Sequence, residues 1–390
     1  MISSRLISLF AIFAAPVPAW SQGSGDLLVT SRFSDAVLRY DGATGAFLGV
    51  FADGGGLDNP VGLTYGPDGD LYVASAVTNS VLRYDGVTGD FVAALPGVDD
   101  PRNVSFGPDG ALYAASAGSN RILRWNASDG VFEAFASGGG LSGPTSFTFG
   151  PDGDLYVVSV LTDRIKRYDG TSGAFLGNFV TTHLNGPHDL VFAPDGELYV
   201  TNAGGIRIRR FDAETGVFLG NFTTDSALSF ALGFVFDRAG FVYVANQGTD
   251  EVLRYDAETG APLGSLVTPG AGGLDGPLFM VFARDPSGWR VRAPYPGVAG
   301  VRNTVELTGG TPGALVALSI GDARVAWLPP SCGGRTTVML PIWSVPLVAD
   351  EAGRAMWSAN VPLSLAGMGF GLQGVGGGGC EATDVVRVGF

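Results

Sequence analysis

The sequence predicts an all-β fold, a six-bladed β-propeller whose last blade is closed by strands from both ends of the repeats, followed by a small β-sandwich. A unit of about 42 residues recurs until about residue 290, and a repeat of this length is typical of propeller blades. Each copy contains short runs of β-branched and aromatic residues separated by turn residues, which indicates four strands per unit. The chain has 61 Gly and 23 Pro among 390 residues and only 15% charged residues, which suits a fold of many tight turns.

Residues 59–89 show the unit most clearly. Gly66-Pro67-Asp68-Gly69 is a turn, because Pro presets φ, Asp bonds the nearby backbone and Gly accepts positive φ. The strands around it are expected at residues 61–65, 71–74, 81–84 and 91–95. The glycine of this turn recurs as Gly69, Gly110, Gly153, Gly196 and Gly240. An Asp also opens the turn after most third strands. Because these Asp residues recur from blade to blade, hydrogen bonding within the turn is favoured over calcium binding as their role.

The two ends of the repeat region complete one another. Residues 27–51 lack an innermost strand of their own, and residues 278–283 lack the three outer strands. Joining them closes a ring of six blades and removes the exposed sheet edges that invite aggregation. A seventh blade would need another outer set after Trp289, and the sequence contains none.

This pattern resembles the NHL-repeat propellers and the related calcium-dependent gluconolactonases and virginiamycin B lyase. The resemblance covers residues 25–290 and rests on the motif P-x-x-L-x-x-x-P-D-G-x-L-Y-V followed by N-x-I/V-x-R-Y-D-x-x-T-G. It implies the fold strongly, whereas the fold itself hosts lactonases, lyases and interaction modules.

The regions outside the repeats predict export and a second domain. Residues 1–22 read as a secretory signal with Arg5, a short apolar stretch and a small-residue cleavage site, so we expect a secreted or periplasmic protein; an uncleaved N-terminal anchor is the alternative. Residues 23–290 are the propeller, residues 291–298 a linker and residues 299–390 a β-sandwich, which looks like the accessory modules of secreted bacterial proteins. No later segment reads as a membrane span, and we expect a monomer.

Net charge argues against two classes of partner, and the cysteine count predicts a disulfide. The net charge of −14 argues against nucleic acid and anionic membranes. Cys332 and Cys380 both lie in the predicted sandwich, and an even count in an exported chain predicts one disulfide; two free thiols or a metal site are the alternatives.

Two sets of equivalent positions are candidates for a binding face at the end of the channel. Where the innermost strands begin, three consecutive blades are polar and the other three carry apolar residues or Gly. The polar positions are Arg102 and Asn103, Thr145 and Ser146, and His188 and Asp189. A second set follows the next strand of each blade and consists of Ser31, Ser75, Ser116, Ser159, Asn202 and Asn246. A funnel with one polar and one apolar side suits a single oriented ligand.

His188 is the main candidate for chemistry. It stands in Gly186-Pro187-His188-Asp189, which resembles the G-P-H segment of the lyase branch, where the resemblance implies an acid, base or ligand. The alternative is a His that bonds a neighbouring blade. A divalent cation, Ca²⁺ or Mg²⁺, would have oxygens from Asp189, Asn103, Asn202 and Asn246, although the Glu of the gluconolactonase pattern is missing.

The sequence therefore indicates two candidate functions. The first is a secreted scaffold that binds a small molecule, peptide or glycan through Arg102, Asn103, Thr145, Ser146, Asp189, Asn202 and Asn246. The alternative is a metal-assisted lactonase- or lyase-like enzyme in which His188 is the general acid/base and Arg102 holds an anionic substrate.

Overall fold

The protein is described by a computed structural model that covers residues 25–283, apart from 194, 224–225 and 238–239, and the backbone of seven strands between residues 290 and 389. The signal segment, Cys332 and Cys380 lie outside the described residues, so the predicted signal and disulfide stay predictions. Within the described part, no helix is long and apolar enough to cross a membrane.

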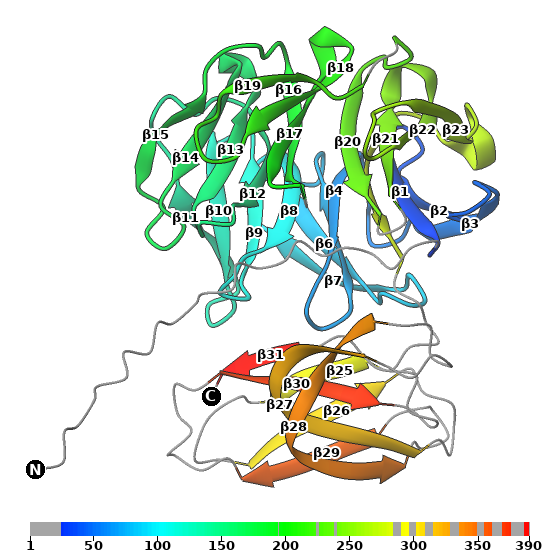
Figure 1. Ribbon diagram of the computed structural model, residues 1–390, viewed down its shortest axis with the longest axis vertical. Helices are drawn as coiled ribbons and strands as arrows, with labels where there is room; N and C mark the ends of the chain where they lie inside the picture. The colour runs from blue at the N-terminus through cyan, green and yellow to red at the C-terminus, as the bar shows by residue number, and fades with distance from the viewer. Residues whose placement is uncertain are drawn as a thin grey trace, which may run out of the picture. The chain divides into compact units, whose positions relative to one another are not determined.

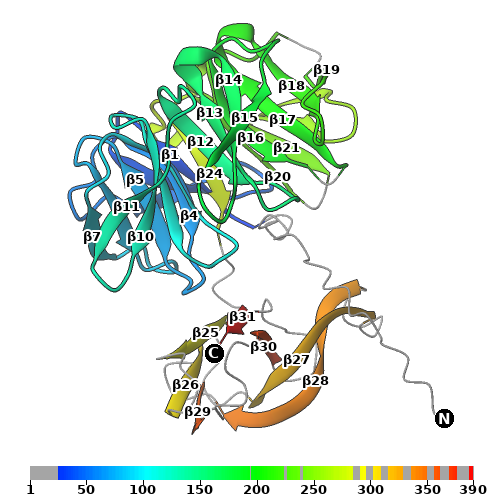
Figure 2. The same cartoon turned by 90° about the vertical axis from the view of Figure 1, so that its left-hand side faces the viewer.

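Residues 27–282 form six four-stranded antiparallel sheets, so the predicted six-bladed propeller is confirmed (Figures 1 and 2). From blade 1 to blade 6, the innermost strands are β24 (Pro277–Phe282), β4 (Pro60–Tyr65), β8 (Pro101–Phe106), β12 (Pro144–Phe149), β16 (Pro187–Phe192) and β20 (Ala231–Phe236). The second strands are β1 (Leu27–Ser31), β5 (Leu71–Ser75), β9 (Leu112–Ser116), β13 (Leu155–Ser159), β17 (Glu197–Asn202) and β21 (Phe241–Asn246).

Two outer strands complete each blade. The third strands are β2 (Ala36–Tyr40), β6 (Ser80–Tyr84), β10 (Arg121–Asn126), β14 (Arg164–Tyr168), β18 (Arg207–Asp212) and β22 (Glu251–Asp256). The outermost are β3 (Phe47–Ala52), β7 (Phe91–Pro96), β11 (Val131–Ala136), β15 (Phe175–Val180), β19 (Phe218–Asn221) and β23 (Pro262–Val267). The second strands are almost fully buried, since neighbouring blades cover both of their faces.

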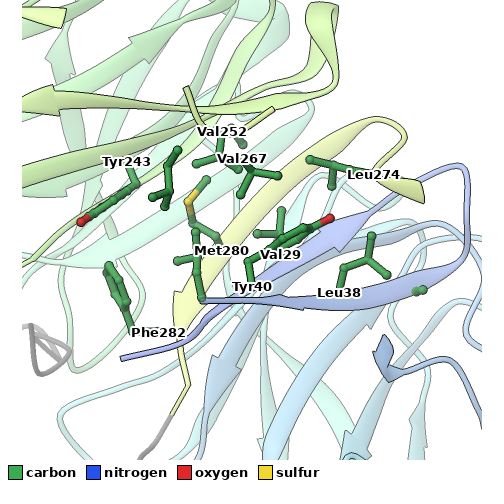
Figure 3. Close-up of a cluster of buried hydrophobic side chains, with 13 residues drawn as sticks. Val29, Leu38, Tyr40, Tyr243, Val252, Val267, Leu274, Met280 and Phe282 are labelled. Atoms are coloured by element: carbon green, nitrogen blue, oxygen red, sulfur yellow. The ribbon is translucent and has the colours of Figure 1, made fainter. Parts of the chain in front are cut away.

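The ring closes as predicted. β24 pairs antiparallel with β1, and Leu27 lies opposite Phe282. Figure 3 shows the apolar cluster at this junction, in which Val29 and Met280 of blade 1 pack with Tyr243 of blade 6. One sheet therefore joins residues about 250 positions apart, which leaves the ring without an open sheet edge at this junction.

The recurring aspartates of the outer turns act on the turns themselves. Asp41 accepts hydrogen bonds from the backbone N–H groups of Ala43 and Thr44 and from the Thr44 hydroxyl. Asp256 does the same for Glu258 and Thr259. These contacts agree with the turn interpretation of the repeated Asp residues.

The C-terminal strands form two separate sheets. β25 (Arg290–Tyr295), β26 (Arg302–Thr308) and β29 (Ala355–Asn360) make one sheet. The second sheet contains β27 (Leu315–Trp327), β28 (Arg335–Val348), β30 (Gly369–Val375) and β31 (Val386–Gly389). The predicted linker, residues 291–298, overlaps β25. That these sheets pack as a β-sandwich stays a prediction.

Candidate functional site

One cavity of about 140 Å³ gathers the second residue of every innermost strand. Six residues of its lining occupy this equivalent position, namely Val61, Arg102, Thr145, His188, Leu232 and Leu278. Arg32, Phe230, Gln247 and Phe279 complete the lining. The positions aligned from the repeats as a candidate ring therefore surround one space at the end of the propeller where the innermost strands begin.

Backbone geometry explains why these side chains face the axis. The residue before each innermost strand has a positive φ, between 49° and 65°, and these residues are Gly276, Asn59, Asp100, Gly143, Gly186 and Phe230. In blades 3 to 6 the pairing register then shifts within the first four residues of the strand, as between Pro187 and Leu190. A bulge at this point turns the second side chain away from the ladder and toward the channel.

The cationic and imidazole groups of the lining come from alternate blades. Arg32 follows β1 in blade 1, Arg102 lies in blade 3 and His188 lies in blade 5. Arg102 pairs with Asp100 at 2.6 Å. The Nε atom of Arg32 is buried and has no hydrogen-bond partner among the residues that the structure describes. Arg32 and Arg102 bring two guanidiniums with one nearby carboxylate, Asp100, so the charge around these two side chains is positive although the whole chain is acidic.

His188 is neutral in this surrounding. Burial, together with the positive charges of Arg102 and Arg32, lowers its pKa to about 4. Its backbone carbonyl accepts a hydrogen bond from the Thr145 hydroxyl at 2.9 Å, which ties blades 4 and 5 together. Above pH 5 the imidazole therefore keeps a free lone pair beside two fixed cations.

The apolar part of the lining comes mainly from blades 6, 1 and 2. Val61 of blade 2, Leu232 of blade 6 and Leu278 of blade 1 occupy the positions that hold Arg102, Thr145 and His188 in blades 3 to 5. Phe279 and Phe230 add aromatic surface to this side. At the second position of the innermost strands the lining is thus polar in blades 3 to 5 and apolar in blades 6, 1 and 2, whereas Arg32 and Gln247 add polar groups from blades 1 and 6.

The third residues of the innermost strands form a buried chain next to the cavity. Asn103 donates to the Ser146 hydroxyl at 2.8 Å, and Ser146 donates to Asp189 at 2.7 Å. Asp189 also accepts the backbone N–H groups of Leu190 and Phe234. Burial raises the pKa of Asp189 to about 6, against the opposing effect of these hydrogen bonds. Asn103, Ser146 and Asp189 therefore link blades 3 to 6 and do not line the cavity.

The second predicted set of positions, at the end of the second strand of each blade, performs the same structural task in all six blades. Its six members are almost fully buried and bond the backbone of the loop before their own innermost strand. Asn202 accepts the Asn185 N–H at 2.5 Å, and Asn246 accepts the Ser229 N–H at 2.6 Å. The structure places neither Asn in the cavity lining.

The predicted cation ligands do not fit a divalent ion as they are arranged. Asn103 directs its carbonyl oxygen to the Val104 N–H, and the oxygens of Asp189, Asn202 and Asn246 accept the N–H and hydroxyl donors described above. The lining of the cavity contains no carboxylate, and its polar side chains are Arg32, Arg102, Thr145, His188 and Gln247. Nowhere in the described chain do three His, Cys, Asp or Glu residues gather as metal ligands would. We therefore derive no step through a metal.

Sequence reasoning missed three lining residues. Arg32 and Gln247 occupy the position directly after the second strand, where the other blades carry Ala76, Ala117, Val160 and Ala203. Phe230 occupies the position before an innermost strand. The sequence signal for Arg32 and Gln247 is a long polar residue at a position that holds Ala or Val in the other four blades.

Fold and cavity define a six-bladed β-propeller with a small-molecule-sized pocket at one end of its channel. Residues 25–258 match the family model described as the virginiamycin B lyase family, and the chain belongs to this family. No curated protein matches it.

Solved structures with TM-scores above 0.5 show the same fold at low identity. A protein of unknown function from Bacteroides caccae is 14% identical with a TM-score of 0.55, covering 67% of this chain and 100% of its own. A chain of a nidogen/laminin complex is 15% identical with a TM-score of 0.56, covering 66% and 98%. A catalytically inactive virginiamycin B lyase variant from Staphylococcus aureus, crystallised with quinupristin, is 20% identical with a TM-score of 0.47, covering 61% and 83%.

Proposed function

We propose that the cavity binds a small organic molecule that carries an acidic group next to an apolar group. The observation that carries this proposal is the composition of the lining, which combines the guanidiniums of Arg32 and Arg102 with the apolar side chains of Leu232 and Leu278. Guanidiniums match the geometry of carboxylates, and a partly desolvated guanidinium binds an anion more strongly than one in open water.

Arg32 supports the anionic group in particular. Its buried Nε lacks a partner among the described residues, and buried donors are normally satisfied. A bound carboxylate would supply that partner and would offset the repulsion between Arg32 and Arg102. The neutral His188 adds a hydrogen-bonding group of either polarity.

Calorimetric titration of phenylacetate and its uncharged analogue phenylacetamide into the full chain tests this function. We expect phenylacetate to bind more tightly, and the Arg102→Gln variant to lose about tenfold in affinity for phenylacetate only. Arg124→Gln is the matched control. Arg124 lies on β10, pairs with Asp109 at 2.7 Å and does not line the cavity. Equal affinity for the two compounds would contradict the anionic recognition, as would a peptide or glycan that binds independently of Arg102.

We propose lyase-like elimination as a second candidate function, and the neutral His188 favours it. The unprotonated imidazole would take a proton from the carbon next to a carbonyl. The C–H electrons would form a C=C bond, the β C–O bond would break, and its electron pair would leave with a carboxylate held by Arg102 or Arg32. The family match supports this chemistry, and charge stabilisation of a leaving carboxylate is a common source of rate enhancement.

A streptogramin B lactone is the substrate with which to test this candidate, followed by liquid chromatography and mass spectrometry. Elimination opens the ring without a change of mass, whereas hydrolysis adds one water. We expect the isobaric product from the wild type and the Arg124→Gln control, and a loss of at least a hundredfold in rate for His188→Gln. Unchanged turnover in His188→Gln would exclude His188 as the base.

We propose in addition that the protein acts outside the cytoplasm, which residues 1–22 support. Mass spectrometry of the N-terminus of the exported protein should show cleavage near Ala19 or Ser21. An intact N-terminus would instead support the anchored alternative.

A further inference from the structure

Junctions between neighbouring blades share one hydrogen bond near the cavity. An Asp or Asn with positive φ ends the loop between the second and third strands and accepts the N–H of the residue that precedes the next innermost strand. The bond measures 2.7–2.8 Å at five junctions, in the pairs Asp35–Asn59, Asn79–Asp100, Asn120–Gly143, Asp163–Gly186 and Asp250–Gly276. The donors in this series are all Gly, Asn or Asp, residues that tolerate positive φ.

The junction between blades 5 and 6 departs from this pattern at both positions. Ile206 stands where the acceptor is expected, with φ of 47°, and Phe230 stands at the donor position, with φ of 50°. An Ile side chain has no hydrogen-bond acceptor, and both bulky residues are costly in the left-handed region. Their side chains are 45% and 58% exposed, so burial does not offset this cost.

The strained conformation of Phe230 is held by its surroundings. The Gln247 N–H donates to the Phe230 carbonyl at 3.2 Å, and the Gly248 N–H donates to the Ser229 carbonyl at 2.9 Å. Asn246 binds the Ser229 N–H. A backbone outlier fixed in this way at the edge of a cavity is typical of a functional position.

Comparison with blades 1 and 4 shows what the exchange achieves. There the position before the innermost strand is Gly276 or Gly143, and a Cβ atom added to either would contact Phe33 or Leu161, two residues beyond the second strand. In blade 6 the bulky residue is Phe230, before the innermost strand, and Gly248 stands two residues beyond the second strand, where a Cβ would clash with Ser229. Blades 3 and 5 also carry Gly at that second position. Phe230 lines the cavity, whereas Phe33 and Leu161 do not.

We propose that Phe230 is a specificity-determining residue, an aromatic platform at the cavity mouth that binds the aromatic ring of the ligand. The inference deepens the proposed function, since it assigns the apolar half of the ligand, and it depends on that function only for the acidic half. An aromatic ring on Phe230 gains stacking energy beyond the area that it buries.

Calorimetric titration of phenylacetate and phenylacetamide into Phe230→Gly tests the platform. Glycine is the residue of blades 1, 4 and 5 at this position, so the variant should fold, and relief of the positive φ should keep its melting temperature at or above that of the wild type. We expect both compounds to bind about tenfold more weakly. Leu161→Ala is the matched control, an apolar rim residue that is 75% exposed and does not line the cavity, and it should bind both compounds as the wild type does.

The outcomes separate this inference from the proposed function. If Phe230→Gly binds both compounds like the wild type, or if it is destabilised, the platform is overturned, while an Arg102-dependent preference for phenylacetate still supports the anion site. If phenylacetamide binds as well as phenylacetate and both depend on Phe230, the platform stands and the anion site fails. If neither compound binds the wild type at millimolar concentration, both are overturned.

Discussion

At the scale of single residues, the cavity is governed by the neutral state of His188. Protonation is disfavoured in the folded protein because burial, Arg102 and Arg32 all oppose a positive charge there. The unfolded chain, with an ordinary His pKa near 6.5, binds that proton more readily. Stability contributed by this group is therefore complete above about pH 6.5 and falls as the pH drops toward 4.

An NMR titration of the imidazole protons measures this directly. We expect a pKa of about 4 for His188 and a rise toward the ordinary value in Arg102→Gln, because one repelling charge is removed. His183, the second histidine of the sequence, gives the other imidazole signals; it lies on the surface and stacks on Phe218 at a centroid distance of 4.1 Å. A His188 pKa at or above 6.5 would show that the arginines do not act on it.

The missing acceptor at the junction of blades 5 and 6 gives a second residue-scale prediction. Ile206→Asp should restore the hydrogen bond to the Phe230 N–H and remove a β-branched residue from positive φ, which stabilises the protein by about 1 kcal/mol. Asp163→Ile is the reverse change at the neighbouring junction and should cost a similar amount. Urea unfolding of both variants measures the effect, and a stability change of the opposite sign in either would contradict the junction account.

At the scale of the element, the end of each second strand holds the loop that starts the innermost strand. Ser116 bonds the Asp99 carbonyl at 2.7 Å, and Asn246 bonds both the Ser229 N–H and the Ala227 carbonyl. The loop in turn sets the positive φ that directs the next side chain toward the cavity. Serine and asparagine both serve here because each side chain hydrogen-bonds the backbone of this loop, and Ser159 accepts the Ser142 N–H at 3.0 Å as Asn246 accepts the Ser229 N–H.

Asn246→Ala separates this structural task from ligand binding. We expect the variant to lose about 1–2 kcal/mol of unfolding free energy, since a buried loop N–H loses its acceptor. Phenylacetate affinity, measured below the melting transition, should stay within about twofold of the wild type. A tenfold loss of affinity in a fully folded variant would instead assign Asn246 to binding, as the sequence predicted.

Sequence periodicity could predict the strands and the six equivalent cavity positions, because the repeats align Val61, Arg102, Thr145, His188, Leu232 and Leu278 without further information. It could not separate cavity side chains from buried ones. Asp189 follows His188 directly, yet a local bulge sends one toward the cavity and the other into the contacts between blades. Arg32 was missed because it follows the second strand, at a position that holds Ala or Val in four blades and that the repeats alone do not place at the cavity.

At the scale of the whole molecule, the ring depends on the strand contributed by the far end of the repeats. Met280 of β24 is 3% exposed and packs with Val29 and Tyr243 across the closure of blades 1 and 6. Because β24 completes a sheet whose other three strands begin the repeats, its loss would expose the edge of β1.

Met280→Ala should therefore cost about 2–5 kcal/mol of unfolding free energy, the range for large-to-small changes in a packed core. Val50→Ala in β3 of the same blade is the control, since Val50 is 52% exposed and its loss should change stability by less than about 0.5 kcal/mol. Chemical unfolding followed by tyrosine and tryptophan fluorescence gives both values. Equal stability of the two variants would mean that the closure contributes little.

The central claim is that the cavity holds an organic anion on its arginines, with the apolar part of the ligand against the apolar residues of the lining. A crystal structure of the full chain with phenylacetate tests it most directly. We predict the carboxylate within hydrogen-bond distance of Arg102 or Arg32, and the ring against Phe230 and Leu232. A carboxylate that points away from both arginines, or a ligand bound elsewhere while the cavity holds a divalent cation, would contradict the account.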